Sequence, residues 1–170
     1  MLRNKTIMNI WRLMAHHEPE HYDEVIRWSR VNGTIAIGWG QVGDLNIRSP
    51  RNQQHLTSLV EQAYHQWSSP SNWVNGGRSL WRLYHDIEIG DLVILNTSRR
   101  ELTMRVASDY YYAGDEYPPD YGHRRKAEVI PIDPNWLWKR SGGTAPGENV
   151  RWTLFRCENT IGDEELKKLL

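Results

Sequence analysis

Residue types that often do chemistry occur in this 170-residue chain, but their spacing does not complete a catalytic site. Pro119-Asp120 could begin the carboxylate set of a metal-dependent nuclease, yet the strand expected after it carries Glu128 without the required lysine. Glu165 and Lys167 have the right spacing but fall on an expected terminal helix. The sequence contains no nucleophile elbow, phosphate loop or dinucleotide fingerprint. We therefore expect a binding protein without catalytic machinery.

The histidines and the cysteine do not indicate a metal site either. His16 and His17 are adjacent, so they lack the i, i+4 spacing of a helical metal-binding pair and would point in opposite directions on a continuing strand. Cys157 is the only cysteine, which excludes a disulfide framework, a cysteine-based zinc site and an iron–sulfur cluster. We expect no metal and no cofactor, and a buried thiol in a reducing, cytoplasmic compartment.

Aromatic residues are the stronger functional signal, because the chain has nine Trp and eight Tyr but one Phe. Trp39 ends a short apolar stretch and has glycine on both sides, and glycine is used where a ligand or another backbone comes close. One interpretation is an open aromatic face at Trp39; the other is that Trp39 belongs to the core, as most tryptophans do. Tyr110 and Tyr112 would share one sheet face, which is also ordinary for strand residues.

Basic residues cluster near these aromatic residues, although 21 Lys and Arg balance 21 Asp and Glu overall. Because the chain is neutral, any affinity for nucleic acid has to come from a local patch or a specific pocket. Interleaved arginine and aromatic residues suit phosphate contacts and base stacking, while a charge cluster is as often a solvated surface. The candidate phosphate-binding residues are Arg99, Arg100, Arg124 and Arg125.

The order of the expected elements indicates an α+β domain built on a strongly curved sheet or small barrel. Apolar runs and alternation predict strands over 9–15, 34–39, 92–95, 102–106, 110–112, 124–132 and 150–157. Helical spacing and capping residues predict helices over 19–32, 50–67, 76–84 and 163–170, and loops are expected over 40–45, 114–121 and 133–146. A single domain is expected over 1–170, with its core at 9–157 and a terminal helix or linker at 158–170; no apolar stretch is long enough to span a membrane.

Seven short stretches, ordered along most of the chain, carry a resemblance to a known family. They are Trp11, then Ile35-Ala36-Ile37-Gly38-Trp39 with Gly43-Asp44-Leu45, then Leu80-Trp81-Arg82, Gly90-Asp91-Leu92-Val93, the tyrosine pair, and His123-Arg124-Arg125. Together they resemble the EVE-type branch of the PUA-like superfamily, which is related to YTH readers. The resemblance is to the N-terminal reader domains of modification-dependent restriction endonucleases. It implies a small PUA-like β-barrel flanked by helices.

The resemblance also implies a pocket that takes a base flipped out of the duplex. By position, it makes Trp39 a wall of an aromatic cage and Asp44 an acceptor for an exocyclic amine. Further walls would be Trp81 and the face of Tyr110 and Tyr112, the pocket rim would carry His16 and His17, and Arg99, Arg100, Arg124 and Arg125 would hold phosphates.

The expected function is the recognition of double-stranded DNA that carries a modified base. The resemblance favours 5-methylcytosine or 5-hydroxymethylcytosine over N6-methyladenine, in the recognition module of a prokaryotic restriction system with a fused or separate nuclease domain. A reader of modified RNA, or an RNA-processing factor with the same barrel, is the alternative. A metal-dependent nuclease with unrecognised ligands is a third hypothesis.

Overall fold

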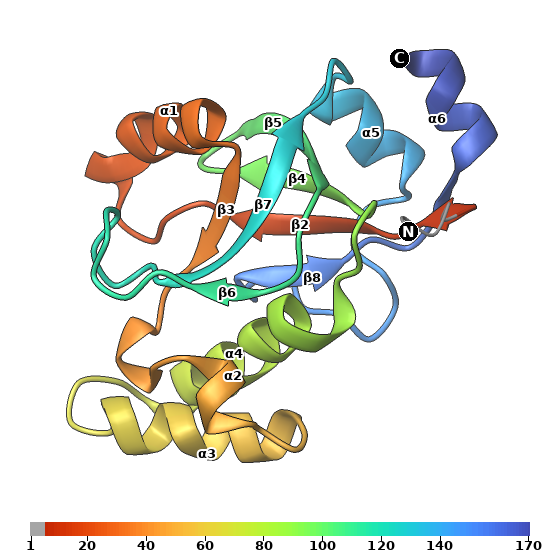
Figure 1. Cartoon of the computed structure of the whole chain (residues 1–170). Coiled ribbons are helices and arrows are strands. Elements are labelled where there is room, and N and C mark those ends of the chain that lie inside the picture. The colour runs from red at the N-terminus through yellow and green to blue at the C-terminus, as the bar shows by residue number, and fades with distance from the viewer. Residues whose placement is uncertain (1–5) are drawn as a thin grey trace.

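A strongly curled mixed β-sheet, an open half-barrel, dominates this α+β fold (Figure 1). The computed structural model describes residues 6–170, so the first five residues of the predicted domain lie outside it. The strand order is β3-β7-β5-β4-β2-β8, and β6 pairs with β7. The strands are β2 (Ile10–Met14), β3 (Thr34–Ile37), β4 (Leu92–Asn96), β5 (Arg100–Val106), β6 (Tyr111–Tyr112), β7 (His123–Val129) and β8 (Leu154–Arg156).

The curved sheet of the prediction is thus confirmed, but its closure into a barrel is not seen. Strands β3 and β8 end the sheet, and no pairing joins them within residues 6–170. A second, two-stranded sheet of β1 (Ile7–Met8) and β9 (Ile161–Gly162) lies outside the main sheet and was not predicted.

The curl of the sheet brings together chain segments that a flat sheet would separate. Strand β2 is parallel to β4, while β5 is antiparallel to both β4 and β7, so β2 and β7 share one direction along the sheet. In a flat sheet the end of β2 and the start of β7 would therefore lie at opposite ends. Instead, the ring of His16, just after β2, stacks on Tyr121, just before β7, with centroids 4.5 Å apart. Figure 1 shows β7 crossing β2 steeply.

Two hydrophobic clusters cover the two faces of the sheet, because successive residues of each strand point to opposite sides. On β2, Trp11 and Leu13 belong to the larger cluster, which also holds buried residues of α1, α3 and α4. Ile10 belongs to the smaller cluster, which α5 and α6 cover with Leu137 and Leu166.

Helices α3 and α4 lie side by side at the bottom of Figure 1, α1 lies at the upper left, and α5 lies at the upper right. The helices are α1 (Tyr22–Asn32), α2 (Leu45–Arg48), α3 (Gln53–Tyr64), α4 (Pro70–Trp81), α5 (Pro134–Arg140) and α6 (Asp163–Leu169). Short turns of other helical types occupy η1 (Pro19–His21), η2 (Gly40–Val42) and η3 (Arg82–Asp86). Within residues 6–170, none of the helices combines the length and the apolar character that crossing a membrane requires.

The Asp91 carboxylate fixes the start of the parallel pair β2 and β4. It is fully buried and accepts hydrogen bonds from the indole Nε1–H of Trp11 and from the backbone N–H groups of Asn9 and Glu88, each at 3.0 Å. Hydrogen bonds to an ionised acceptor are stronger than neutral ones, which compensates for the burial of the charge. Trp11 and Asp91, two residues of the family-like segments, are therefore direct partners.

Two of the predicted loops contain helices. The predicted loop 133–146 is wrong over α5, which Asp133 caps by accepting from Asn135 N–H at 2.8 Å and in which proline occupies the first position. The predicted loop 40–45 runs into α2, where the Asp44 side chain accepts from Asn46 N–H at 2.9 Å. Both helices are seven residues or shorter, which is too short to show a clear helical period.

The predicted helix boundaries between the two central helices are also corrected. Helix α3 starts at Gln53 rather than at residue 50, because Asn52 caps it by accepting from His55 N–H at 2.8 Å. It ends at Tyr64 rather than at residue 67. Helix α4 starts at Pro70 rather than at residue 76.

The glycine pair at 76–77 lies inside α4, at positions where this helix packs closely against other elements. A Cβ on Gly77 would lie 2.0 Å from Thr57 Oγ1 and 2.6 Å from Thr57 Cα in α3. Only a residue without a side chain lets the two helices approach this closely.

We predict that Gly77→Ala destabilises the protein by about 2 kcal/mol or more, since overpacking against backbone atoms forces the helices apart. Alanine in an exposed helix would instead stabilise by about 0.5–1 kcal/mol relative to glycine, so the sign of the effect tests the contact. Urea unfolding followed by circular dichroism measures it. Gly162→Ala is the control, because Gly162 has a φ of −80° and a Cβ there would lie 4.0 Å from the nearest atom.

Candidate functional site

A cavity of about 300 Å³ opens where β2 and β3 end, beside α3 and α4. Its position follows from the curl of the sheet, which brings the segment after β2 against the loop before β7. The cavity is lined by Met14, His16, His17, Gly38, Trp39, Tyr64, Ser68, Asn72, Asn75, Asp120, Tyr121 and Thr153. We call this cavity the aromatic pocket.

The backbone of Trp39 has a strained left-handed conformation, and its side chain contacts α4. Its φ of 60° and ψ of 36° lie in the left-handed region, which costs a residue other than glycine about 1–3 kcal/mol. The indole Nε1–H donates to Asn72 Oδ1 at 3.2 Å. A Cβ on Gly76 would come within 2.9 Å of the same ring, so glycine on α4 makes room for the indole. Such strain is concentrated at functional sites.

A buried hydrogen-bond relay holds Trp39 in this conformation. The carbonyl oxygen of Trp39 can only accept, so Nε2 of His123 carries a proton and donates to it at 3.0 Å. Nδ1 of His123 therefore accepts from the Tyr110 hydroxyl at 2.7 Å, and that hydroxyl accepts from Leu45 N–H at 3.1 Å. Burial lowers the pKa of His123 to about 4, so the ring is neutral at pH 7.

Tyr121 and two histidines form a stack at the pocket mouth. The Tyr121 ring lies 4.5 Å from the His16 ring, which in turn lies 4.9 Å from the His17 ring, with interplanar angles of 15° and 8°. The Tyr121 hydroxyl also contacts His17 Nδ1 at 2.6 Å. His16 is buried, while the His17 side chain is 68% exposed. Because β2 ends at Met14, the two adjacent histidines are not on a continuing strand, and their rings stack instead of pointing to opposite sides.

Asp120 provides the charge in the pocket lining. Its φ of 67° makes it the second left-handed non-glycine residue of the pocket. The Tyr64 hydroxyl donates to Asp120 Oδ1 at 3.1 Å, and Gly40 N–H donates to the Asp120 carbonyl at 3.1 Å. Burial raises the pKa of the Asp120 carboxyl group above its ordinary value. A carboxylate here can accept hydrogen bonds from a ligand amine.

The structure brings three of the predicted pocket residues together and leaves four outside the lining. His16, His17 and Trp39 line the cavity. Of the other four, Tyr110 and Tyr112 support it from behind: Tyr110 through the His123 relay and Tyr112 by donating to the Gly40 carbonyl at 2.7 Å. Asp44 caps α2, and Trp81 stacks on His85 with centroids 4.4 Å apart.

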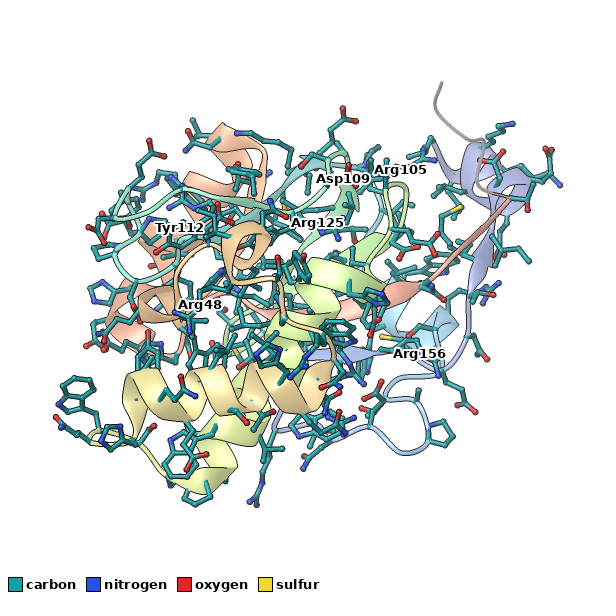
Figure 2. All side chains as sticks on the ribbon, turned by 60° about the horizontal axis from the view of Figure 1, so that its bottom comes forward. Arg48, Arg105, Asp109, Tyr112, Arg125 and Arg156 are labelled. Atoms are coloured by element: carbon teal, nitrogen blue, oxygen red, sulfur yellow. The ribbon has the colours of Figure 1, made fainter. Side chains whose placement is uncertain are left out.

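Burial removes Arg124 and Arg125 from the predicted phosphate-binding set. Arg124 is 4% exposed and Arg125 is 3% exposed. Arg124 donates to the backbone carbonyls of Glu116, Tyr117 and Tyr121 at 2.8–2.9 Å, so it fastens the loop before β7. Arg125 points to the other face of β7, where it donates to the carbonyls of Leu83, Tyr84 and Ser108. Figure 2 shows Arg125 near Asp109. Burial lowers the pKa of Arg125 below its ordinary value, and the negative charge of Asp109 offsets part of this lowering.

The other two predicted phosphate ligands lie at the β4–β5 hairpin and do not line the pocket. Arg99 is exposed and pairs with Glu101 at 2.9 Å. Arg100 lies over the Trp138 ring at 4.7 Å and donates to Asn135 on α5 at 3.2 Å.

Several pocket residues were not predicted to line a pocket, although the sequence marks Asp120 as a possible nuclease carboxylate. Tyr121 and Asp120 come from the proline-rich loop 114–121, and Asn72 comes from a helix whose start was placed too late. Trp67 directly precedes the pocket-lining Ser68 and is 68% exposed. The sequence carries a signal for this exposed tryptophan, since Trp67 is the only large apolar residue in the stretch 65–72.

Fold and site together define an α+β protein with a half-barrel sheet and an aromatic pocket at the strand ends. The chain belongs to the family described as a domain of unknown function, DUF8426, which it matches over residues 11–145. The matched range includes every lining residue of the pocket except Thr153. No curated protein matches the chain.

The His123 relay predicts a specific pH dependence of stability. The folded-state pKa of about 4 lies below the value of about 6.5 for an unfolded histidine, so the unfolded chain binds an extra proton between these values. Folding stability is therefore lost as the pH falls from 6.5 to 4, by about 3 kcal/mol at 1.36 kcal/mol per unit.

Urea unfolding of the wild type and of His123→Gln from pH 7.5 to pH 4 tests this expectation. The variant lacks this titration, so the difference between the two unfolding free energies should shrink toward pH 4. Parallel curves would show that His123 does not titrate as the relay requires.

Proposed function

We propose that this protein is a reader of modified DNA, which binds a flipped modified base in the aromatic pocket as the recognition module of a modification-dependent restriction system. The observation that carries the proposal is the strained Trp39 at the end of β3, whose ring is fixed by Asn72 and Gly76 in the wall of a cavity of about 300 Å³. The resemblance to EVE-type domains of the PUA-like superfamily supports the proposal, because it implies a base-binding pocket with Trp39 as a wall.

The chemistry of the pocket suits a nucleobase. Extruding a base from the duplex costs a few kcal/mol, which stacking and hydrogen bonds in the pocket have to offset. Trp39, Tyr64 and Tyr121 offer aromatic surface, and aromatic contacts add about 0.5–1.5 kcal/mol beyond the area they bury. The cavity volume lies at the small end of ligand sites, as expected for one base rather than a larger ligand.

Polar groups on the pocket wall provide the means to read the edge of a base. Asp120 can accept from an exocyclic amine, which replaces the role expected of Asp44. Asn72 uses its side-chain oxygen to accept from Trp39, so its amide N–H groups can donate to a ring nitrogen or carbonyl oxygen of the base. 5-Methylcytosine and 5-hydroxymethylcytosine have the amine and the acceptors that this pair complements.

Modified RNA is the second candidate, because an unpaired base enters such a pocket without being extruded from a duplex. The exposed Trp67 beside the pocket offers a stacking surface of the kind that single strands use. Competition between methylated duplex DNA and single-stranded RNA distinguishes the two proposals.

The direct test is fluorescence-anisotropy binding to one duplex in four forms: unmodified, 5-methylcytosine, 5-hydroxymethylcytosine and N6-methyladenine. Near-physiological salt suppresses plain phosphate attraction. We expect a preference of tenfold or more, about 1.4 kcal/mol, for one cytosine modification. Equal binding to all four forms would refute the proposal that the protein reads modified DNA.

We predict that Trp39→Ala removes this preference while weak binding to all duplexes remains, since the variant loses one wall of the pocket and no charged group. Trp136→Ala is the matched control, because Trp136 lies on α5, is 40% exposed and does not line the pocket. Circular dichroism confirms that both variants fold. Unchanged discrimination in folded Trp39→Ala would remove Trp39 from the site.

A further inference from the structure

A second hollow, of about 410 Å³, adjoins the aromatic pocket at the start of α1. The two share His16, His17, Asp120 and Tyr121. The lining of the second hollow includes three carboxylates and three imidazoles, and within residues 6–170 it includes no lysine or arginine. A hollow with this composition attracts cations and disfavours a bare phosphate.

Three side chains in or beside this hollow converge like metal ligands. Glu18, Glu20 and His21 each place one ligand atom within 4.8 Å of the others. Tetrahedral coordination with bonds of about 2.0–2.2 Å separates ligand atoms by about 3.4 Å, so modest side-chain rotations would close the set. The Glu18 and His21 side chains are 46% and 45% exposed, which leaves them free to rotate.

Two imidazole rings lie beside the Glu18 carboxylate, and one of them has a further hydrogen-bond partner. His21 Nε2 lies 3.1 Å from Glu18 Oε2, and His17 Nε2 lies 3.4 Å from Glu18 Oε1. The Tyr121 hydroxyl, at 2.6 Å from His17 Nδ1, orients that ring so that Nε2 faces Glu18. A hydrogen-bond partner on the second ring nitrogen is typical of metal-ligating histidines.

The chain segment has the spacing of a known zinc motif in a different local structure. His17-Glu18-Pro19-Glu20-His21 fits the pattern His-Glu-x-x-His, in which a helix presents both histidines to zinc. Here Pro19 begins the short turn η1, so His17 lies before any helix. Glu18 lies between the histidines, which makes its carboxylate a ligand candidate.

We propose that Glu18, Glu20 and His21 form a binding site for a divalent metal ion of the zinc type. Imidazole nitrogen together with carboxylate oxygen suits such ions. This departs from the sequence-based expectation of no metal. If the proposed function is correct, the ion also supplies positive charge beside the pocket, where Arg124 is buried and cannot contact a phosphate.

The test is isothermal titration of the full chain with ZnCl₂ in the absence of DNA. We expect one Zn²⁺ per chain and an affinity at least tenfold weaker in His21→Ala and in Glu18→Gln. His85→Ala is the matched control, because the His85–Asp86 pair is also an exposed histidine with a carboxylate, at 2.8 Å, outside this hollow. Its affinity should equal that of the wild type.

A visible absorption band with Co²⁺, present in the wild type and absent in His21→Ala, would independently support coordination by this set. Absence of saturable Zn²⁺ binding, or equal loss in the control, would overturn the site whatever the protein does with DNA. Anisotropy with and without EDTA then tests its role: if Zn²⁺ binds but EDTA leaves DNA affinity unchanged, the metal site stands and its contribution to DNA binding is refuted.

Discussion

The hydrogen bond from His123 Nε2–H to the Trp39 carbonyl is the interaction on which the pocket depends. It opposes the strain of a left-handed tryptophan, and it requires an imidazole that is buried and neutral. Tyr110 supplies the second half of the relay and thereby ties β7 to the start of α2 through Leu45. One buried ring thus fixes the backbone of the pocket wall and the loop behind it, and the indole is positioned without itself being fully enclosed.

The sequence predicted those parts of the fold that local pattern decides. The strands at 92–95 and 102–106 follow from apolar runs and alternation, and both form β4 and β5 with a bulge at Leu95 and Asn96. The pocket was only half predictable. Trp39 carries a local signal in its flanking glycines, whereas Asp120 and Tyr121 reach the pocket through the curl of the sheet. That curl is a property of the whole sheet, and no short segment encodes it.

The arginine pair shows why a charge cluster in a sequence can be misinterpreted. Neighbouring residues of a strand point to opposite faces, so burial of both Arg124 and Arg125 means that β7 is covered on both sides. Each guanidinium group then donates to backbone carbonyls: Arg125 to those of η3 on one face, and Arg124 to those of the loop before β7 on the other. Their role is the closure of backbone hydrogen bonds, which the planar five-donor group does well.

If the aromatic pocket binds a base as proposed, the three hydrogen bonds from Arg124 to backbone carbonyls of the loop before β7 bear on the kinetics of recognition. Because folding has already ordered this loop, the protein loses little conformational entropy when a ligand enters. Entry then requires no slow ordering of this loop, so two bases that differ by one methyl group would enter at similar rates. Discrimination between them would then lie in residence time, with the matching base leaving the site more slowly.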